Sequence, residues 1–399
     1  MRYQSYLNTA VKIIRSYTGA EPLAAYLKKF FAAEKKYGST DRKQIAGLCY
    51  NYYRLGKAVP GMLTEERIIL ATFLCEQSSS EFLKFHKPDW NEMITNPLTE
   101  KLLIINYQLL INDLFPYTTP LSDGIDQLRF ATSFLTQPEL FIRIRPGKNK
   151  SVEKKTEAAG LTGKQLTATC MAFPNATKLE TILELDKEVI IQDYNSQQVL
   201  NFLSPSPPAG GELFKDSVFS IGHRLSVWDC CASSGGKSIL AYDILGGKVE
   251  LTVSDIRESI LANLKKRFSA AGIRNYNSFI ADLSTAGCQL PIAGCSLVIC
   301  DAPCTGSGTW SRTPEQLYFF NPGMIRSFAE RQKKIVSNAV TALQKGGLFF
   351  YITCSVFREE NEAVVDFIKE KFHLQLLQME LLKGYDKKAD SMFTAVFMK

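Results

Sequence analysis

Two cysteines of this chain stand where a thiol can act as a nucleophile. Cys304 lies in DAPCTGSG and Cys354 in YITCS, and each segment directly follows an apolar run that predicts a β-strand. Both cysteines occupy polar loops rich in small residues, so we predict two reactive thiols at the ligand-binding end of a sheet. A buried cysteine is ordinarily an inert apolar residue. We interpret six others in that way: Cys49, Cys75, Cys170, Cys288, Cys295 and Cys300.

A thiolate placed beside a methyl donor can methylate a pyrimidine ring. Ring carbon C5 is a weak nucleophile, but addition of a thiolate to C6 turns C5 into an enamine-like carbon that attacks a methylsulfonium. The C5 proton must then leave and the thiolate must be eliminated, a stage that a second thiol, or a water it positions, can assist. Asp301 can hydrogen-bond the N3 edge of the ring if its carboxyl is protonated or shares a proton with the ring.

A loop of small residues, DCCASSGGKS, follows the predicted strand 225–229 and leads into a helix. The helix N-terminus offers unpaired N–H groups, but neither GxGxxG nor the phosphate loop GxxxxGK[ST] is present. Asp255 ends the next strand, 19 residues after Gly236, where a carboxylate can accept both ribose hydroxyls. Asp282 ends the third strand and can contact an adenine amino group. Each carboxylate alone is typical of a turn or cap, but together they predict a nucleoside cofactor without phosphate, S-adenosylmethionine.

The ten cysteines do not predict a metal site or a disulfide framework. They show no regular spacing and no CxxC pair, and the chain has only three histidines. We therefore predict no metal, and reduced thiols in the cytoplasm. No apolar run approaches the roughly 20 residues that span a bilayer, and the start of the chain lacks the apolar block of a signal peptide.

Strands and helices alternate from about residue 224 onward, which predicts an α/β fold with a Rossmann-like, largely parallel sheet and helices on both faces. Ligands bind such sheets beyond the carboxyl ends of the strands. Helical periodicity predicts an all-α domain over 1–135, and PELFIRIRPGKN begins a small α+β segment over 138–192. The catalytic domain is then 193–399, and SPSPPAGGE within it is a surface loop by composition.

The net charge of +7 is concentrated near the N-terminus, where residues 1–57 hold 11 lysines and arginines against three acidic residues. Such a segment suits a phosphate backbone. A solvated helix face with ordinary lysines explains the charge equally well.

The motifs DAPCTGSGTWSRTPE, YITCSVFREENE and DCCASSGGKS closely resemble those of the Nop/Sun family of RNA (cytosine-C5)-methyltransferases. The resemblance implies that Cys354 is the nucleophile, that Cys304 assists product release, and that Asp301 belongs to the same site. It also implies a set of cofactor contacts: Cys231, Ala232, Ser233, Ser234, Gly235, Gly236, Lys237, Asp255, Asp282 and Asp301. The chain departs from the family at Ser234, which replaces a proline, and at Ile260, which replaces an arginine whose contact Arg257 can supply.

Two further segments resemble parts of the same family. GSTDRKQIAGLCYNYYRLGK is similar to the NusB-like helical RNA-binding domain that some members carry, and LFIRIRPGKN resembles an RRM-like insertion. The RNA contacts that we predict are Arg42, Lys43, Arg143, Arg145 and Lys148. For the last three, a solvated strand edge is the alternative. Trp310 and Arg312 follow Cys304 and line either the base pocket or a core.

The sequence thus predicts a monomeric cytoplasmic methyltransferase that forms 5-methylcytosine in structured RNA, most of all ribosomal RNA, with no membrane partner. A catalytically silent RNA-binding or ribosome-assembly factor on the same fold is the first alternative. The intact Cys304, Cys354, Asp255 and Asp282 argue against it. A methyltransferase acting on protein or a small molecule is the second alternative, and it would not need two cysteines at these strand ends.

Overall fold

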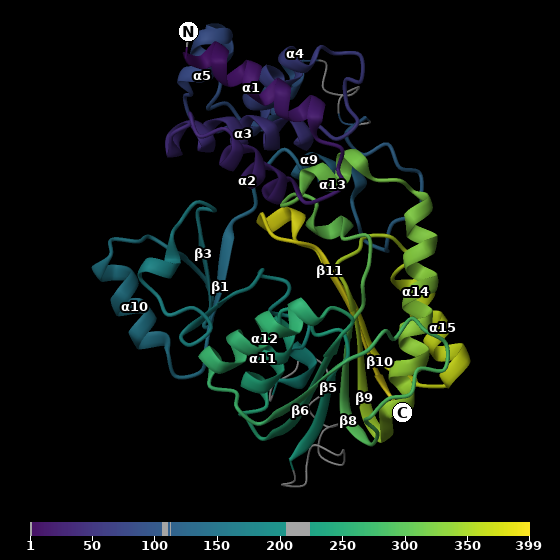
Figure 1. Cartoon of the computed structure of the whole chain (residues 1–399). Helices are drawn as coiled ribbons and strands as arrows, with labels where there is room; N and C mark the ends of the chain where they lie inside the picture. The colour runs from purple at the N-terminus through teal and green to yellow at the C-terminus, as the bar shows by residue number, and fades with distance from the viewer. Residues whose placement is uncertain (1, 106–110, 112, 205–223) are drawn as a thin grey trace. The chain divides into compact units, whose positions relative to one another are not determined.

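The computed structural model describes the chain except for residues 1, 106–110, 112 and 205–223 (Figure 1). Most of the loop SPSPPAGGELF therefore lies outside the described residues. The chain forms two compact units. The first contains residues 1–119, 126–138 and 309–322, and the second contains 120–125, 139–308 and 323–399. The α+β segment thus shares a unit with the large sheet, whereas a piece of the expected catalytic domain joins the helical unit.

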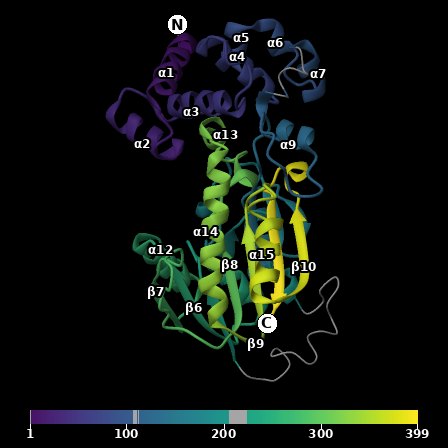
Figure 2. The same ribbon diagram turned by 90° about the vertical axis from the view of Figure 1, so that its right-hand side faces the viewer.

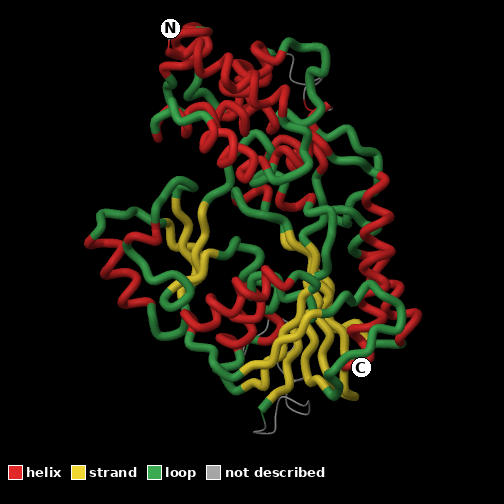
Figure 3. The backbone as a smooth tube through the Cα atoms, in the orientation of Figure 1, coloured by secondary structure: helices red, strands yellow, loops and turns green. Residues whose placement is uncertain are grey.

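The first unit is helical, as the spacing of its apolar residues predicts (Figure 3). Leu7, Val11 and Ile14 form a buried stripe along its first helix and share one core with Leu48 and Cys49 of its third helix. Its described helices are α1 (Arg2–Ser16), α2 (Leu23–Ala33), α3 (Ser39–Arg54), α4 (Thr64–Cys75), α5 (Glu81–His86), α6 (Pro88–Glu92), α7 (Leu98–Ile104), α9 (Gln127–Ser133) and α13 (Pro314–Phe319).

Trp310 explains why residues 309–322 belong to this helical unit. Its side chain is fully buried and lies 4.7 Å from the ring of Phe320, 6.3 Å from that of Phe115 and 6.4 Å from that of Tyr117, measured between ring centroids. Burial of a tryptophan removes a large apolar area from water. The interpretation of Trp310 as a core residue is therefore confirmed, and the interpretation as a base-pocket residue is wrong.

The α+β segment of the second unit forms a four-stranded antiparallel sheet in the order β2-β3-β1-β4. Its strands are β1 (Leu140–Ile144), β2 (Lys164–Thr167), β3 (Cys170–Phe173) and β4 (Val189–Ile191), with α10 (Asn149–Ala158) between β1 and β2. Ile142 and Ile144 pack with Val152 of α10 in one core, as the alternation along β1 predicts.

The large sheet has the strand order β10-β11-β9-β8-β5-β6-β7. Its strands β7, β6, β5, β8 and β9 are parallel, and β11 and β10 complete one edge in antiparallel orientation. The strands are β5 (Leu225–Asp229), β6 (Val249–Asp255), β7 (Tyr276–Ile280), β8 (Cys295–Asp301), β9 (Leu343–Thr353), β10 (Gln375–Leu382) and β11 (Met392–Met398). The predicted Rossmann-like α/β fold is confirmed.

Helices cover both faces of this sheet (Figures 1 and 2). α11 (Gly236–Ile244) and α12 (Glu258–Ala271) share a core with Val227, whereas α14 (Gly323–Ala339) and α15 (Glu362–Phe372) share the opposite core with Trp228. Val227 and Trp228 are neighbours on β5, so successive side chains feed the two cores and the strands are apolar throughout. Among the described residues, no helix combines the length and apolar character that crossing a bilayer requires.

Candidate active site

A cavity of about 390 Å³ opens at the carboxyl ends of the parallel strands. Three carboxylates line it, Asp255, Asp282 and Asp301, together with Cys304 and Cys354. These five residues lie at or just after the ends of four strands, β6, β7, β8 and β9, and the fold brings them together because parallel strands end at the same edge. The structure thus assembles the strand-end residues that the sequence singles out.

The loop between β5 and α11 is shaped to admit a ligand. Ser233 and Gly235 both have positive φ, 47° and 83°, which turns the chain sharply before the helix begins. A Cβ on Gly235 would lie 2.8 Å from Phe268, so only glycine fits there, whereas a Cβ on Gly236 would meet no atom within 4 Å. The loop is anchored because Ala232 N–H donates to the Ser254 carbonyl at 2.9 Å. Ser234 is held differently, since its Oγ accepts from Arg267 at 3.0 Å.

Asp255 and Asp282 are both held by local hydrogen bonds. Asp255 Oδ2 accepts from the backbone N–H of Ser233 at 3.0 Å, and its Oδ1 accepts from Arg257 Nε at 3.1 Å. Asp282 Oδ1 accepts from the Ser284 hydroxyl at 2.6 Å, and this bond is the main reason that the pKa of Asp282 is lowered. Both residues line the cavity, and a carboxylate can accept further hydrogen bonds. The residues present therefore fit a ribose and an adenine amino group.

Lys237 connects the cofactor loop to Asp301. Its Nζ donates to Asp301 Oδ2 at 2.6 Å, and only 13% of the lysine side chain is exposed. Burial lowers the pKa of Lys237, but the Asp301 carboxylate outweighs burial, so the pKa is raised overall and the ammonium stays charged. Asp301 therefore faces the cavity with a fixed proton donor beside it, a pairing that the sequence alone did not suggest.

The two cysteine sulfurs are neighbours, with Cys304 Sγ 3.3 Å from Cys354 Sγ. The pKa of the Cys304 thiol is raised, first because it hydrogen-bonds to Cys354 and second because it is buried. The Cys304 thiol is thus held in its protonated form. Both sulfurs border the cavity that also holds the three carboxylates.

Glu360 is one of two residues near the site that sequence reasoning missed. Its fully buried carboxylate accepts from Thr305 N at 2.8 Å, from Thr305 Oγ1 at 2.6 Å and from Ser355 Oγ at 2.5 Å. Thr305 and Ser355 directly follow Cys304 and Cys354 in the sequence. One carboxylate therefore ties the two cysteine loops together. The motif YITCSVFREENE contains Glu360, but nothing in the sequence indicates what it binds.

Arg331 on α14 also lines the cavity, and sequence reasoning missed it as well. It lies within a long amphipathic helix, where an arginine is typical of a solvated face. Only the packing of α14 against the sheet brings Arg331 to the strand ends. No pattern in the sequence could have identified it.

Arg143 and Arg145 do not have the exposure that the predicted RNA contacts require. Arg143 Nη1 and Arg145 Nη2 each lie 2.7 Å from a carboxylate oxygen of Asp243 on α11, and the two arginine side chains are only 5% and 11% exposed. The prediction for these two is therefore corrected: they are internal ion-pair residues that join β1 to α11. Arg42 and Lys43 are exposed on α3 and Lys148 is half-buried, so these three remain candidates.

Comparison with known proteins finds relatives of the part of the chain that forms the large sheet. Residues 222–396 match the family described as 16S rRNA methyltransferase RsmB/F. A probable ribosomal RNA small subunit methyltransferase B from Synechocystis is 26% identical over 242 residues, covering 58% of this chain and 50% of that protein. Ribosomal RNA small subunit methyltransferase F from Vibrio cholerae is 31% identical over 150 residues, which cover 38% of this chain and 32% of that protein. The chain thus spans half or less of these relatives.

Two solved structures from Pyrococcus horikoshii share the fold. A methyltransferase homologue has a TM-score of 0.57 and 20% identity, covering 75% of this chain and 98% of its own. The structure of NSun6 with SFG has a TM-score of 0.57 and 14% identity, and the match covers 68% of this chain and 94% of that chain. The large sheet therefore has the same fold as the sheet of these structures.

Proposed function

We propose that this chain, whose residues 222–396 match the RsmB/F methyltransferase family, makes 5-methylcytosine in ribosomal RNA through a covalent bond between Cys354 and the base. The observation that supports the proposal best is the 3.3 Å approach of Cys304 Sγ and Cys354 Sγ at the wall of a cavity with three carboxylates. A methyltransferase that acts on oxygen or nitrogen needs no thiol there. Two thiols suit a reaction in which one adds to the ring and must later leave it.

The first step belongs to Cys354. Its thiolate forms a bond to C6 of the cytosine, and the electron pair of the C5–C6 double bond makes C5 nucleophilic. We place the N3 edge of the ring beside Asp301 and the Lys237 ammonium that donates to it, so that the ammonium can stabilise the developing negative charge. S-adenosylmethionine, when bound, would supply an electrophilic methyl group for C5, and the broken sulfur–methyl bond would leave S-adenosylhomocysteine.

Release restores the aromatic ring. The C5 proton leaves to a water molecule, and we assign to the Cys304 thiol the role of positioning that water. The electron pair of the broken C5–H bond re-forms the double bond as the C6–S bond breaks, and Cys354 departs as a thiolate. Cys304 borders the same cavity and holds a proton next to Cys354, so the second thiol is close to both the proton and the leaving sulfur.

The RNA and its compartment are part of the same proposal. Arg42 and Lys43 are exposed on α3 of the basic N-terminal segment, where they can pair with phosphates while the target base is drawn out of its stack. Lys148 serves the same purpose in the α+β segment. We place the reaction in the cytoplasm, where ribosomal RNA is made in bacteria, and we expect the chain to act as a monomer.

Bisulfite sequencing of total RNA from cells with and without the gene tests this proposal and identifies the cytosine. Loss of protection at one ribosomal cytosine on deletion, restored by the wild-type gene and not by Cys354→Ala, is the expected result. The Cys288→Ala variant is the control for loss of a thiol outside the site. Unchanged protection at every site would favour a silent RNA-binding factor instead.

The cysteine roles are tested separately with purified enzyme and ribosomal RNA from the deletion strain. Cys304→Ala should accumulate an RNA–protein adduct that survives a denaturing gel, because addition proceeds while release is impaired. Cys354→Ala should form no adduct and no product. Adducts in both variants, or in neither, would contradict these roles.

A further inference from the structure

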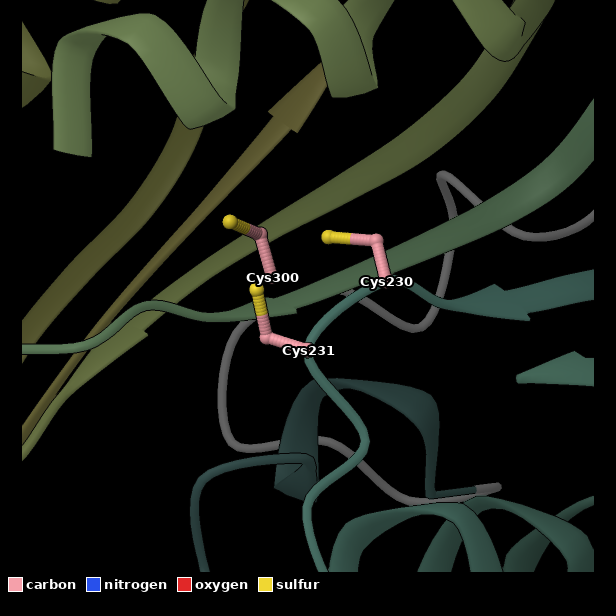
Figure 4. Close-up of side chains that lie close together, drawn as sticks. All are labelled: Cys230, Cys231 and Cys300. Atoms are coloured by element: carbon pink, nitrogen blue, oxygen red, sulfur yellow. The ribbon is translucent and has the colours of Figure 1, made fainter. Parts of the chain in front are cut away.

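Three cysteines converge beside the cofactor cavity, and the methyl-transfer reaction uses none of their sulfurs. The Sγ atoms of Cys230, Cys231 and Cys300 all lie within 4.8 Å of one another. Figure 4 shows the side chains of Cys230 and Cys231 turned toward Cys300. Cys230 and Cys300 are 1% and 0% exposed, whereas Cys231 is half-buried and lines the cavity together with Cys230.

The register of two neighbouring strands produces this arrangement. In the parallel pair β5 and β8, Asp229 lies opposite Ile299, so the next residues along the two chains are Cys230, directly after β5, and Cys300 on β8. The backbone N–H of Cys230 donates to the Ile299 carbonyl at 2.9 Å, which continues the ladder to this point. Cys231 then turns back into the same space. The cluster is therefore held by the rigid centre of the sheet.

We propose that Cys230, Cys231 and Cys300 form a binding site for a thiophilic d10 metal ion, of which Zn²⁺ is the ordinary biological example. Zinc–sulfur bonds are about 2.3 Å long, so three thiolates around one ion lie roughly 4 Å apart. The observed spread of at most 4.8 Å requires only small side-chain rotations. Soft thiolate ligands select such ions over Mg²⁺ or Ca²⁺.

Binding of Zn²⁺ by the three thiols releases protons. Each thiol that becomes a ligand loses one proton to solvent, so three thiolates and one Zn²⁺ carry a net charge of −1 at the site. The fourth coordination position of zinc remains open, and the half-buried Cys231 gives the ion a route in from the cavity. A site with three protein ligands and one open position is typical of zinc that exchanges a ligand.

A cluster that only filled space would have no need for sulfur at all three positions. A buried cysteine packs as a small apolar residue, and alanine or valine would serve equally well beside the apolar core of β8. The proximity of all three sulfurs and their access to the cavity are what separate a ligand set from packing. The site is independent of the proposed cytosine chemistry, because it uses neither Cys304 nor Cys354.

The test measures Zn²⁺ binding to the full-length, reduced and metal-free protein. We expect one equivalent of Zn²⁺ in competition with a chromophoric chelator, and one equivalent of Cd²⁺ with the ultraviolet sulfur-to-cadmium absorption of three thiolates. Cys300→Ser should weaken binding at least tenfold. Cys295→Ser is the matched control, since Cys295 is a fully buried cysteine on the same strand but outside the cluster, and it should bind like wild type.

A Cys304→Ser, Cys354→Ser double variant tests whether the two active-site thiols, rather than the cluster, bind the Zn²⁺. It should retain the full equivalent of Zn²⁺; loss of binding there, with retention in Cys300→Ser, would overturn the proposal. Alkylation of the wild-type protein keeps the proposal testable if Cys300→Ser does not fold. Zn²⁺ should then protect Cys231, the half-buried member of the cluster, and protection confined to cysteines outside the cluster would refute the site.

Discussion

Glu360 offers the most direct test of how the active site is positioned. The side chain is fully buried, and its carboxylate holds Thr305 and Ser355, the residues that follow the two cysteines. Gln332 Nε2 donates to it as well, at 3.2 Å. Glu360→Ala removes the acceptor for all of these donors at once, including the backbone N–H of Thr305, which cannot rotate to find another partner.

The expected loss can be worked out from these contacts. A buried donor left without an acceptor costs about 1–3 kcal/mol, and the deleted side chain leaves a cavity as well. We expect Glu360→Ala to lower the free energy of unfolding by about 3–5 kcal/mol. Glu360→Gln keeps the shape and one carbonyl oxygen for Thr305 N–H, while the Thr305 and Ser355 hydroxyls can turn to accept from the new amide. Its expected loss is about 1–2 kcal/mol.

Activity should fall together with stability. A displacement of about 1 Å in a reacting group can cost 10²-fold in rate, and Glu360 fixes both cysteine loops. Urea unfolding and single-turnover methylation are the two assays, and Glu359→Gln is the control for a neighbouring carboxylate. If Glu360→Ala unfolds within about 0.5 kcal/mol of wild type and keeps its turnover, the positioning argument is refuted.

The pH dependence gives an independent check. Burial raises the pKa of Glu360 above its ordinary value of 4.5. Between 4.5 and the raised pKa, the folded state therefore holds a proton that the unfolded chain has lost, and the stability of the wild type falls as the pH rises. Glu360→Gln has no such group. The stability advantage of wild type over Glu360→Gln should therefore narrow as the pH rises from about 4.5; an advantage that widens would contradict the sign.

Three further perturbations test other parts of the molecule. Arg42→Ser with Lys43→Ser should reduce the slope of log affinity for RNA against log salt by about 1–2, as measured by filter binding, and an unchanged slope would remove these side chains from the interface. Asp243→Ala should lower the free energy of unfolding by about 3–5 kcal/mol, because it leaves two buried arginines without their counter-ion; a loss below about 1 kcal/mol would mean that water replaces the carboxylate. Trp310→Ala should cost about 3–5 kcal/mol by urea unfolding, and a stable variant would contradict its placement in the core.

The strand-end residues could be predicted from the sequence because the fold class alone brings them together. Alternating strands and helices indicate a parallel sheet, and every residue that follows such a strand reaches the same edge. Asp255, Asp282, Asp301, Cys304 and Cys354 all line one cavity for that reason. No distance between them had to be known in advance.

The errors concern contacts between residues far apart in the chain. Alternation along β1 identified the strand, but it could not show that Arg143 meets Asp243, which lies 100 residues later. The convergence of Cys300 with Cys230 could not be predicted for the same reason, since it depends on the order and register of β5 and β8. Trp310 follows a catalytic motif in the sequence, yet its ring partners come from the helical unit.

The close approach of the two reactive sulfurs depends on backbone packing as much as on the cysteines. In the parallel pair β8 and β9, Asp301 lies opposite Ile352, so Cys304 and Cys354 leave the sheet at similar heights. Gly308 then donates its N–H to the Cys354 carbonyl at 2.8 Å and accepts from Ser391 N at 2.9 Å. A Cβ on Gly308 would lie 3.0 Å from the Cys354 carbonyl and closer still to that of Ser391, so any side chain there would push the loops apart. Glycine at this position and the carboxylate of Glu360 therefore act together, one allowing the loops to meet and the other holding them.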